Sequence, residues 1–213
     1  MEGQDGMRAL QVQWTIVPRT APQPWIKCGR CGTFRPFRPS GRTRLNANGK
    51  TLDAWLIYKC VSCDSTWNRP ILERRNVRDL GSSMLQDLQG GEAGWIRDLA
   101  FDVASLRRNA ARIDEFADAD VRKTVTGDAT GDWTSLDIEL VVPLPINLRL
   151  DRLLSMELGL PRSRLRTLHE HSRLCVHPSR KDVLRRPIRS GLRITIEVLE
   201  EGDLASLRRS VGD

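Results

Sequence analysis

Two cysteine pairs, Cys28-Gly29-Arg30-Cys31 and Cys60-Val61-Ser62-Cys63, decide the fold of the stretch that contains them. The 28 residues between the pairs are enough for a hairpin of two or three strands. A Cys-x-x-Cys turn points both thiolates at one centre, and two such turns complete a closed tetrahedral shell of sulfurs with no open position for a substrate. We therefore expect a zinc ribbon with a structural Zn²⁺ ion held by Cys28, Cys31, Cys60 and Cys63. Disulfides or a redox dithiol are the alternatives, but a redox motif needs no second copy.

The composition argues against a membrane protein. Hydrophobic residues make up 39% of the 213 residues, which is enough for cores. The longest uncharged apolar run, residues 140–148, contains two prolines and is too short to cross a bilayer. The N-terminus lacks a basic region followed by an apolar signal segment. We expect a cytoplasmic protein, where reduced thiols favour metal over disulfides.

The charges are segregated along the chain. Residues 19–78 carry 13 basic and 3 acidic side chains, residues 149–193 carry 12 and 4, and residues 79–148 carry 6 and 13. Clustered Lys and Arg side chains release counterions when they meet phosphates. Two basic segments flanking an acidic one therefore favour a protein that binds a polyanion. The alternative is that the charges serve only solubility, but charges dispersed along the chain would do this equally well.

Apolar periodicity predicts the elements outside the ribbon. Alternation predicts strands at residues 10–16, 54–58 and 136–140. Two helices, at 78–89 and 92–113, form a hairpin around Gly90-Gly91, and the acidic, aperiodic stretch 117–132 is a candidate linker. In the C-terminal part we expect two helices, separated at Gly159 and Pro161, and then strands near 174–176 and 192–198. The charged tail from residue 200 should be helical or frayed.

Residues 149–198 resemble the S4-type RNA-binding module, in which two helices pack on a bent sheet and present basic residues to structured RNA. The matching residues are Arg149-Leu150-Asp151-x-x-Leu154, Leu158-Gly159-Leu160, Ser163-Arg164, Leu168, Arg173-Leu174-x-Val176, Lys181 and Gly191. Ser172 stands where the family prefers glycine, and His177-Pro178 stands where it has an Asn-Gly turn. The resemblance implies that the RNA backbone is contacted by Arg149, Arg162, Arg164, Arg166, Arg173 and Lys181.

The ribbon has a resemblance of its own. The segments Trp55-Leu56-Ile57-Tyr58-Lys59-Cys60 and Cys63-Asp64-Ser65-Thr66-Trp67-Asn68 are similar to a family of bacterial zinc-ribbon proteins with no assigned function. We expect an α+β protein with five parts. These are a zinc ribbon with an N-terminal strand (1–77), a helical hairpin (78–116), a linker with a strand (117–148), an S4-like module (149–199) and a charged tail (200–213).

The sequence contains no nucleophile elbow, zinc-protease helix, dinucleotide-binding glycine motif or kinase signature. His169, His171, Cys175 and His177 form the only other ligand-like cluster. Two histidines that are two residues apart on a helix point to different sides, so we expect them to be structural. The chain outside the ribbon and the S4-like segment is also too short for a separate catalytic domain, so we expect no enzyme.

The sequence therefore predicts a non-catalytic binder of structured RNA, of the ribosomal or transfer class, with the ribosome as a candidate partner. A second phosphate-binding surface is expected on the ribbon, formed by Arg35, Arg38, Arg42, Arg44 and Lys50. One alternative is a DNA-binding or transcription-associated adaptor. Another is a protein-interaction scaffold that uses an exposed Trp67 or the acidic helices.

Overall fold

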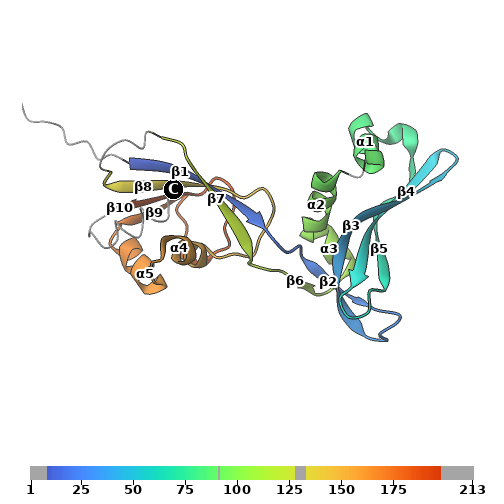
Figure 1. Ribbon diagram of the computed structural model, residues 1–213, viewed down its shortest axis with the longest axis horizontal. Helices are drawn as coiled ribbons and strands as arrows, with labels where there is room; N and C mark the ends of the chain where they lie inside the picture. The colour runs from blue at the N-terminus through green and yellow to red at the C-terminus, as the bar shows by residue number, and fades with distance from the viewer. Residues whose placement is uncertain (1–8, 91, 128–132, 198–213) are drawn as a thin grey trace, which may run out of the picture. The chain divides into compact units, whose positions relative to one another are not determined.

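The computed structural model describes residues 9–90, 92–127 and 133–197. The chain divides into two compact units. We call Thr20–Phe116 the ribbon unit, and Met1–Arg19 together with Ala117–Asp213 the terminal unit. Each unit mixes strands and helices, which confirms the α+β class (Figure 1). No helix in the described ranges is long and apolar enough to cross a membrane.

The ribbon unit is built on an antiparallel sheet with the strand order β5-β4-β3-β2-β6. Its elements are β2 (Gln23–Lys27), β3 (Phe34–Asn48), β4 (Thr51–Cys60), β5 (Thr66–Asn76), the 3₁₀ turn η1 (Val77–Asp79), α1 (Ser82–Gly90), α2 (Ala93–Phe101), α3 (Val103–Asn109) and β6 (Ile113–Asp114). The long β3–β4 hairpin is the one expected between the cysteine pairs.

Strict alternation along β4 gives this sheet two different faces. Leu52, Ala54, Leu56, Tyr58 and Cys60 are all buried, whereas the residues between them are half-buried. The buried face is covered by the helices, because Leu52, Ala54 and Leu72 form a core cluster with Leu88 of α1 and with Trp95 of α2. The opposite face carries no helix of the ribbon unit (Figure 1).

The single helix expected at residues 92–113 is wrong. The structure has two short helices, α2 and α3, which meet at Asp102. The Asp102 side chain accepts a hydrogen bond from the backbone N–H of Ser105 at 2.9 Å, which makes it the N-cap of α3. The chain beyond α3 then becomes extended at Ala110 and forms β6.

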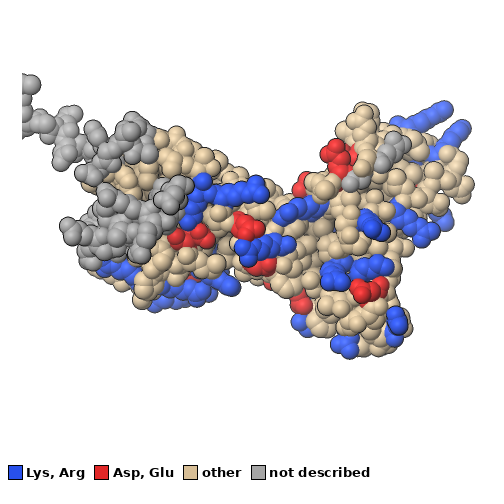
Figure 2. All heavy atoms as spheres, in the orientation of Figure 1, with Lys and Arg blue, Asp and Glu red and all other residues tan. Residues whose placement is uncertain are grey.

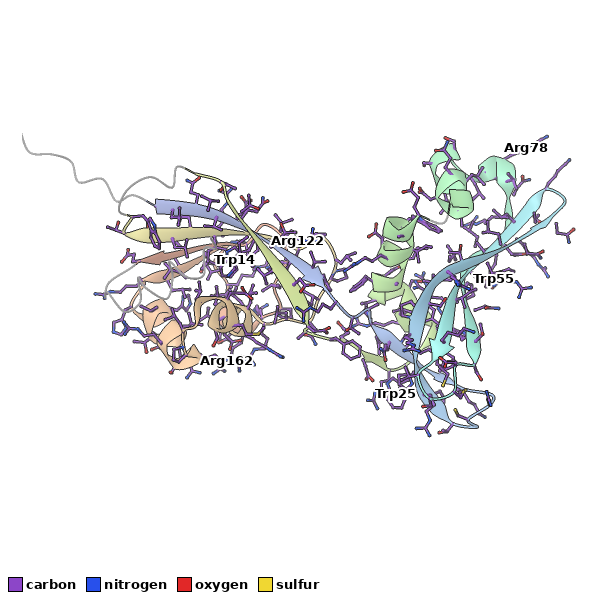
Figure 3. All side chains as sticks on the ribbon, viewed as in Figure 1. Trp14, Trp25, Trp55, Arg78, Arg122 and Arg162 are labelled. Atoms are coloured by element: carbon purple, nitrogen blue, oxygen red, sulfur yellow. The ribbon has the colours of Figure 1, made fainter. Side chains whose placement is uncertain are left out.

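The terminal unit has a five-stranded sheet in the order β7-β1-β8-β10-β9, in which β1 and β8 are parallel and the other neighbours antiparallel. Its elements are β1 (Ala9–Pro18), β7 (Ala119–Val125), β8 (Ser135–Val141), α4 (Leu150–Leu158), α5 (Arg162–Glu170), β9 (Leu174–His177), the 3₁₀ turn η2 (Val183–Arg185) and β10 (Arg193–Glu197). One face of the sheet packs on α4 and α5 through a core that includes Trp14 (Figure 3).

This architecture corrects the expected division of the chain. The N-terminal strand β1 lies in the terminal unit, between β7 and β8, and not with the ribbon. The candidate linker 117–132 contains β7, an edge strand paired with β1 from Val12 to Pro18. The pairing is non-local, and the alternation of Ala119, Val121 and Val125 with charged residues is too weak to reveal it from sequence. The predicted tail 200–213 lies outside the described residues.

The C-terminal expectations on local structure are confirmed in that same unit. The two helices and the strands β8, β9 and β10 are present within a few residues of the expected positions. Gly159 closes α4 in the left-handed conformation, with a φ of 68°. Ser172, which follows α5, also has a positive φ, of 59°. A serine therefore occupies a backbone conformation that favours glycine.

Candidate metal centre and basic surfaces

Four cysteine side chains converge at one end of the ribbon sheet. Cys28 follows β2, Cys60 is the last residue of β4, and Cys31 and Cys63 lie in the two turns that come after them. The sulfur atoms of all four lie within 4.8 Å of one another. Cys28 and Cys60 are buried, and Cys31 and Cys63 are half-buried.

The two cysteine turns are built alike. The backbone N–H of Gly32 donates to Cys28 O, and that of Asp64 donates to Cys60 O, both at 2.9 Å. Gly32 and Asp64 both have a positive φ, of 72° and 57°. The first cysteine of each turn also donates its own N–H across the turn, Cys28 to Thr33 O and Cys60 to Ser65 O. Two equivalent turns thus aim two sulfurs each at a shared centre.

Hydrogen bonds favour the thiolate form at part of this cluster. Cys63 Sγ lies 3.1 Å from Ser65 Oγ, and hydrogen bonds from Ser65 lower the pKa of Cys63 to about 6. The backbone N–H of Cys31 lowers the pKa of Cys28 in the same way. Cys31 moves in the opposite direction, because its hydrogen bond with Cys63 and its desolvation raise its pKa to about 12. A cation bound beside Cys31 would oppose this last shift, because a nearby positive charge favours the thiolate.

The sulfur positions fit a metal ion. At a metal–sulfur distance of about 2.3 Å, tetrahedral geometry places neighbouring sulfurs about 3.8 Å apart. The Sγ atoms of Cys28 and Cys63 lie 3.5 Å apart. An all-cysteine shell suits a soft or borderline ion and leaves no position for a substrate. The four cysteines can therefore hold a metal ion, as the sequence predicts, in a site that is structural in kind.

Aromatic side chains support the sheet next to the cysteines. Trp67 packs against Tyr58, with ring centroids 5.3 Å apart, and against the edge of Phe37, at 6.3 Å. Trp67 is half-buried in this cluster. Trp67 is therefore not exposed as the protein-interaction alternative expects, because its ring packs against Tyr58 and Phe37.

Arg69 is a buried residue that sequence reasoning missed. Its guanidinium donates to Leu99 O, at the end of α2, at 2.6 Å and to the Tyr58 hydroxyl at 3.3 Å. It also lies 3.7 Å from the Asp102 carboxylate. Arg69 thereby ties the strand β5 to the junction between α2 and α3. No local sequence signal marks it, because its partner residues are as much as 33 positions away.

The basic residues expected on the ribbon are spread along the β3–β4 hairpin. Arg42 and Arg44 line a hollow of about 560 Å³ on the side of the sheet away from the helices, together with Ser40, Ile57, Lys59, Thr66 and Asn68. Arg38 instead pairs with Asp64 beside the cysteines at 3.3 Å, and Arg35 lies opposite Ile26 on β2. Lys50 is at the tip of the β3–β4 hairpin, where Figure 2 shows further Lys and Arg spheres.

The arginines expected on the terminal unit are only partly together. Arg162 (labelled in Figure 3) and Arg166, both exposed on α5, line a hollow of about 320 Å³ with Arg185 of η2. Three carboxylates, those of Asp151, Glu170 and Asp182, line the same hollow. The other expected residues lie elsewhere: Arg149 forms an ion pair with Asp151, Arg164 is half-buried, and Arg173 and Lys181 are exposed outside it.

Comparison with known proteins places this chain in a family. Residues 45–180 match the model of a family described as "Protein of unknown function (DUF1062)". The match covers more than half of the 213 residues. The chain belongs to the DUF1062 family. The matched segment contains Cys60, Cys63 and α5 but begins after Cys28 and Cys31. No curated protein matches the chain, and no solved structure does.

The histidines of this DUF1062 protein bond to separate backbone carbonyls. His169 Nδ1 lies 2.8 Å from Leu174 O, and His171 Nδ1 lies 2.8 Å from Thr167 O. Each ring therefore helps to fix the end of α5 or the chain that follows it. Among the described residues, the four ribbon cysteines are the one group of metal-ligating side chains found close enough together to share an ion.

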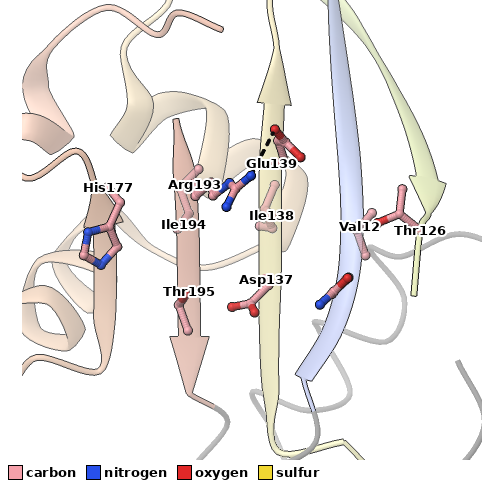
Figure 4. A pocket seen from close by; sticks show the side chains of 10 residues that line it. Val12, Thr126, Asp137, Ile138, Glu139, His177, Arg193, Ile194 and Thr195 are labelled. Atoms are coloured by element: carbon pink, nitrogen blue, oxygen red, sulfur yellow. Dashed lines mark ion pairs between the residues drawn. The ribbon is translucent and has the colours of Figure 1, made fainter. Parts of the chain in front are cut away.

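A further hollow, of about 430 Å³, lies on the helix-free face of the terminal unit (Figure 4). Its polar lining includes Asp137 and Glu139 of β8 and Arg193 and Thr195 of β10, with Arg193 3.8 Å from Glu139. His177 of β9 and Thr126 close its two sides. Arg193 can offset only one of these two carboxylates, so the charged side chains of the lining sum to a negative charge and the hollow does not favour an anion.

Proposed function

We propose that this DUF1062 protein is a non-catalytic, cytoplasmic binder of structured RNA, of the ribosomal or transfer class. The ion in the ribbon is Zn²⁺ in this proposal, because four cysteines in a closed shell are a typical structural zinc set. Zinc would supply folding free energy and no reaction step, since it cross-links the ends of β2 and β4. The residues that would hold it are Cys28, Cys31, Cys60 and Cys63.

The observation that carries the RNA proposal is the arrangement of α5. Leu165 and Leu168 anchor one side of this helix in the core, which leaves Arg162 and Arg166 exposed on the other side, beside Arg185. Guanidinium groups suit phosphate recognition, because each presents a planar fork of donors, and here the helix fixes the backbone positions from which the two side chains start. Lys and Arg spheres along the α4–α5 side of the terminal unit in Figure 2 extend this basic surface.

The resemblance to S4-type modules supports the same proposal. The family prefers glycine at the position of Ser172, and Ser172 adopts the positive φ that such a glycine would supply. The chain can therefore make the same turn after α5 despite the substitution. The three carboxylates around Arg162 and Arg166 limit the positive potential, so we expect salt-sensitive affinity that depends on a few arginines.

A salt titration of RNA binding tests the proposal. Transfer RNA and duplex DNA of equal length are titrated by fluorescence anisotropy at several salt concentrations. Replacing Arg162 and Arg166 with Gln should flatten the slope of log affinity against log salt by about 0.7 to 0.9 per residue, because each arginine neutralises roughly one phosphate.

The matched control replaces Arg107 and Arg108 on α3 with Gln, which removes the same charge from another helix. Arg107 already pairs with Glu115 at 3.4 Å, so the control should change the slope little. Unchanged slopes for the Arg162/Arg166 variant would remove α5 from the interface. Equal affinity for duplex DNA would favour the DNA-binding adaptor, and no binding to either would exclude both.

A further inference from the structure

The helix-free face of the ribbon sheet has the chemistry of a base-stacking platform. Trp55 lies on this face of β4, opposite Arg44 on β3 and Pro70 on β5. Its ring, labelled in Figure 3, is half-buried, and the guanidinium carbon of Arg44 lies 6.0 Å from the ring centroid. Two residues further along β4, Ile57 continues the same apolar strip into the hollow.

Uncompensated positive charge lines the hollow at the Ile57 end of this strip. The hollow is lined by Arg42, Arg44 and Lys59 and by no carboxylate. Lys59 Nζ donates to the neutral Thr66 hydroxyl at 2.6 Å, so its charge stays available. Among the described residues, none of these three cations lies within ion-pairing distance of an acidic side chain. Asn68 adds an exposed amide, which can both donate and accept at the edge of a base.

We propose that this face binds unpaired nucleotides, with a base stacked on Trp55 and the adjoining phosphates held by Arg42, Arg44 and Lys59. Single-stranded nucleic acids are bound by aromatic side chains in a basic groove, because every base offers a π-face. Paired bases cannot stack in this way, since their faces are already covered by neighbouring base pairs. The inference rests on the proposed RNA function and assigns the unpaired part of that RNA to the ribbon unit.

The ribbon unit itself supplies a contrasting site. Trp25 on β2 is also half-buried beneath an arginine, with the guanidinium carbon of Arg112 3.9 Å from its ring centroid. Its indole N–H, however, donates to Asp114 at 2.7 Å, and Arg112 pairs with the same carboxylate. The charge there is satisfied within the protein, so Trp25 is a structural stack and a matched negative control for Trp55.

Binding of a labelled, unpaired RNA to the full zinc-loaded chain, measured by fluorescence anisotropy, tests the inference. The RNA is about 12 nucleotides long, which lies within the usual size range of single-strand binding sites. Trp55→Leu should weaken binding about five- to a hundredfold, as expected for one lost stacking contact, and Trp55→Phe should restore most of the affinity. The double variant Arg44→Gln/Lys59→Gln should flatten the slope of log affinity against log salt. Two controls, Trp25→Leu and the double variant Arg107→Gln/Arg108→Gln, should keep an affinity near that of the wild type. Circular dichroism and zinc content check that each variant folds.

A second measurement keeps the test independent of variant folding. Ultraviolet cross-linking of the wild-type protein to a 5-iodouridine oligonucleotide, followed by mass spectrometry, should place the link on the peptide that contains Trp55. The inference would be overturned if Trp55→Leu bound the oligonucleotide as the wild type does and no link formed at Trp55. The proposed function would still stand in that case if transfer RNA binding depended on Arg162 and Arg166. No binding to any RNA would overturn both.

Discussion

Arg69 carries a buried charge that the ribbon unit needs for packing and not for binding. Its side chain is 3% exposed, while the Asp102 carboxylate beside it is 45% exposed and so only partly offsets the charge. Most of its stabilising effect should come from the hydrogen bonds to Leu99 O and the Tyr58 hydroxyl. Removal of the guanidinium would take its partner from the Tyr58 hydroxyl and would leave Leu99 O with only the backbone N–H of Asp102.

We expect Arg69→Met, which keeps most of the side-chain volume, to destabilise the ribbon unit by about 1 to 3 kcal/mol. Urea unfolding followed by tryptophan fluorescence measures the change. Arg75→Met is the matched control, because Arg75 is exposed on the same strand, and it should alter stability by less than about 0.5 kcal/mol. Equal midpoints for the two variants would show that Arg69 is not a structural tie.

Tyr58 allows a pH prediction, because it is the only tyrosine in the chain. Burial raises the pKa of its hydroxyl above the usual value of about 10, and the charge of Arg69 only partly opposes this shift. The folded state thus holds the proton more tightly than the unfolded state does. Stability should be unaffected below pH 10 and should fall as the pH rises above it.

Absorbance at 295 nm during an alkaline titration measures this ionisation directly. The folded protein should titrate above the midpoint of the same protein in urea. A folded midpoint at or below the unfolded one would mean that the Tyr58 hydroxyl is open to solvent.

The cysteine ligands could be predicted from the sequence, whereas the side chains that support them could not. A Cys-x-x-Cys turn is local, so its spacing alone fixes where two sulfurs point. Arg69 meets Leu99 across 30 residues, and Trp25 meets Asp114 across 89. Such contacts depend on sheet pairing and helix placement, which no local pattern specifies.

At the scale of elements, Asp102 decides the shape of the helical segment. The apolar repeat continues across it, so periodicity alone predicts one helix at residues 92–113. The Asp102 side chain accepts a hydrogen bond from the Ser105 N–H, which offers this backbone group a partner other than a helical carbonyl. The first helix can therefore end, and α3 begins after Asp102. Hydrophobic periodicity predicted which face is buried but not where the backbone is interrupted.

We expect Asp102→Ala to destabilise the ribbon unit by about 1 kcal/mol, the usual cost of losing an N-cap. Hydrogen exchange should show the loss first at the amides of α3. Asp98→Ala, an exposed change on α2, is the control and should leave α3 protection unchanged. Increased helicity in Asp102→Ala would instead indicate that α2 and α3 fuse once the cap is removed.

Elements with strong local patterns were predicted well, and those that depend on distant partners were not. The alternation in β8 and β10 and the leucine spacing in α4 fixed those elements from the sequence. The sequence predicts a linker at β7, because its charged residues hide the alternation, and this segment becomes a strand only by pairing with β1. The alternation of β1 predicts a strand but not its unit, because that depends on non-local pairing with β7 and β8.

At the scale of the whole molecule, the ribbon unit is an insertion between two neighbouring strands. The chain leaves the terminal unit after β1 and returns to it before β7, and these strands pair up to Pro18 and Ala119. The backbone N–H of Arg19 donates to Asp118 O at 3.0 Å, so the two connections start side by side. Insertions at such closely spaced positions leave the host fold intact, which allows each unit its own core.

This insertion predicts that loss of the metal should unfold one unit and spare the other. In Cys60→Ser the cluster loses a ligand, and the ribbon unit should lose its structure because metal binding and folding are one equilibrium there. The purified wild-type protein should contain one zinc per chain, and the variant much less. Hydrogen exchange should show lost protection in β4 and β5 but retained protection in β8 and β10, whose core lacks any contribution from the four clustered cysteines.

Cys175→Ser is the matched control, since Cys175 is a cysteine of the terminal unit outside the cluster, and it should change neither zinc content nor exchange. Simultaneous loss of protection in both sheets of Cys60→Ser would show that the units fold as one, and full protection in both would show that the ribbon does not require its metal.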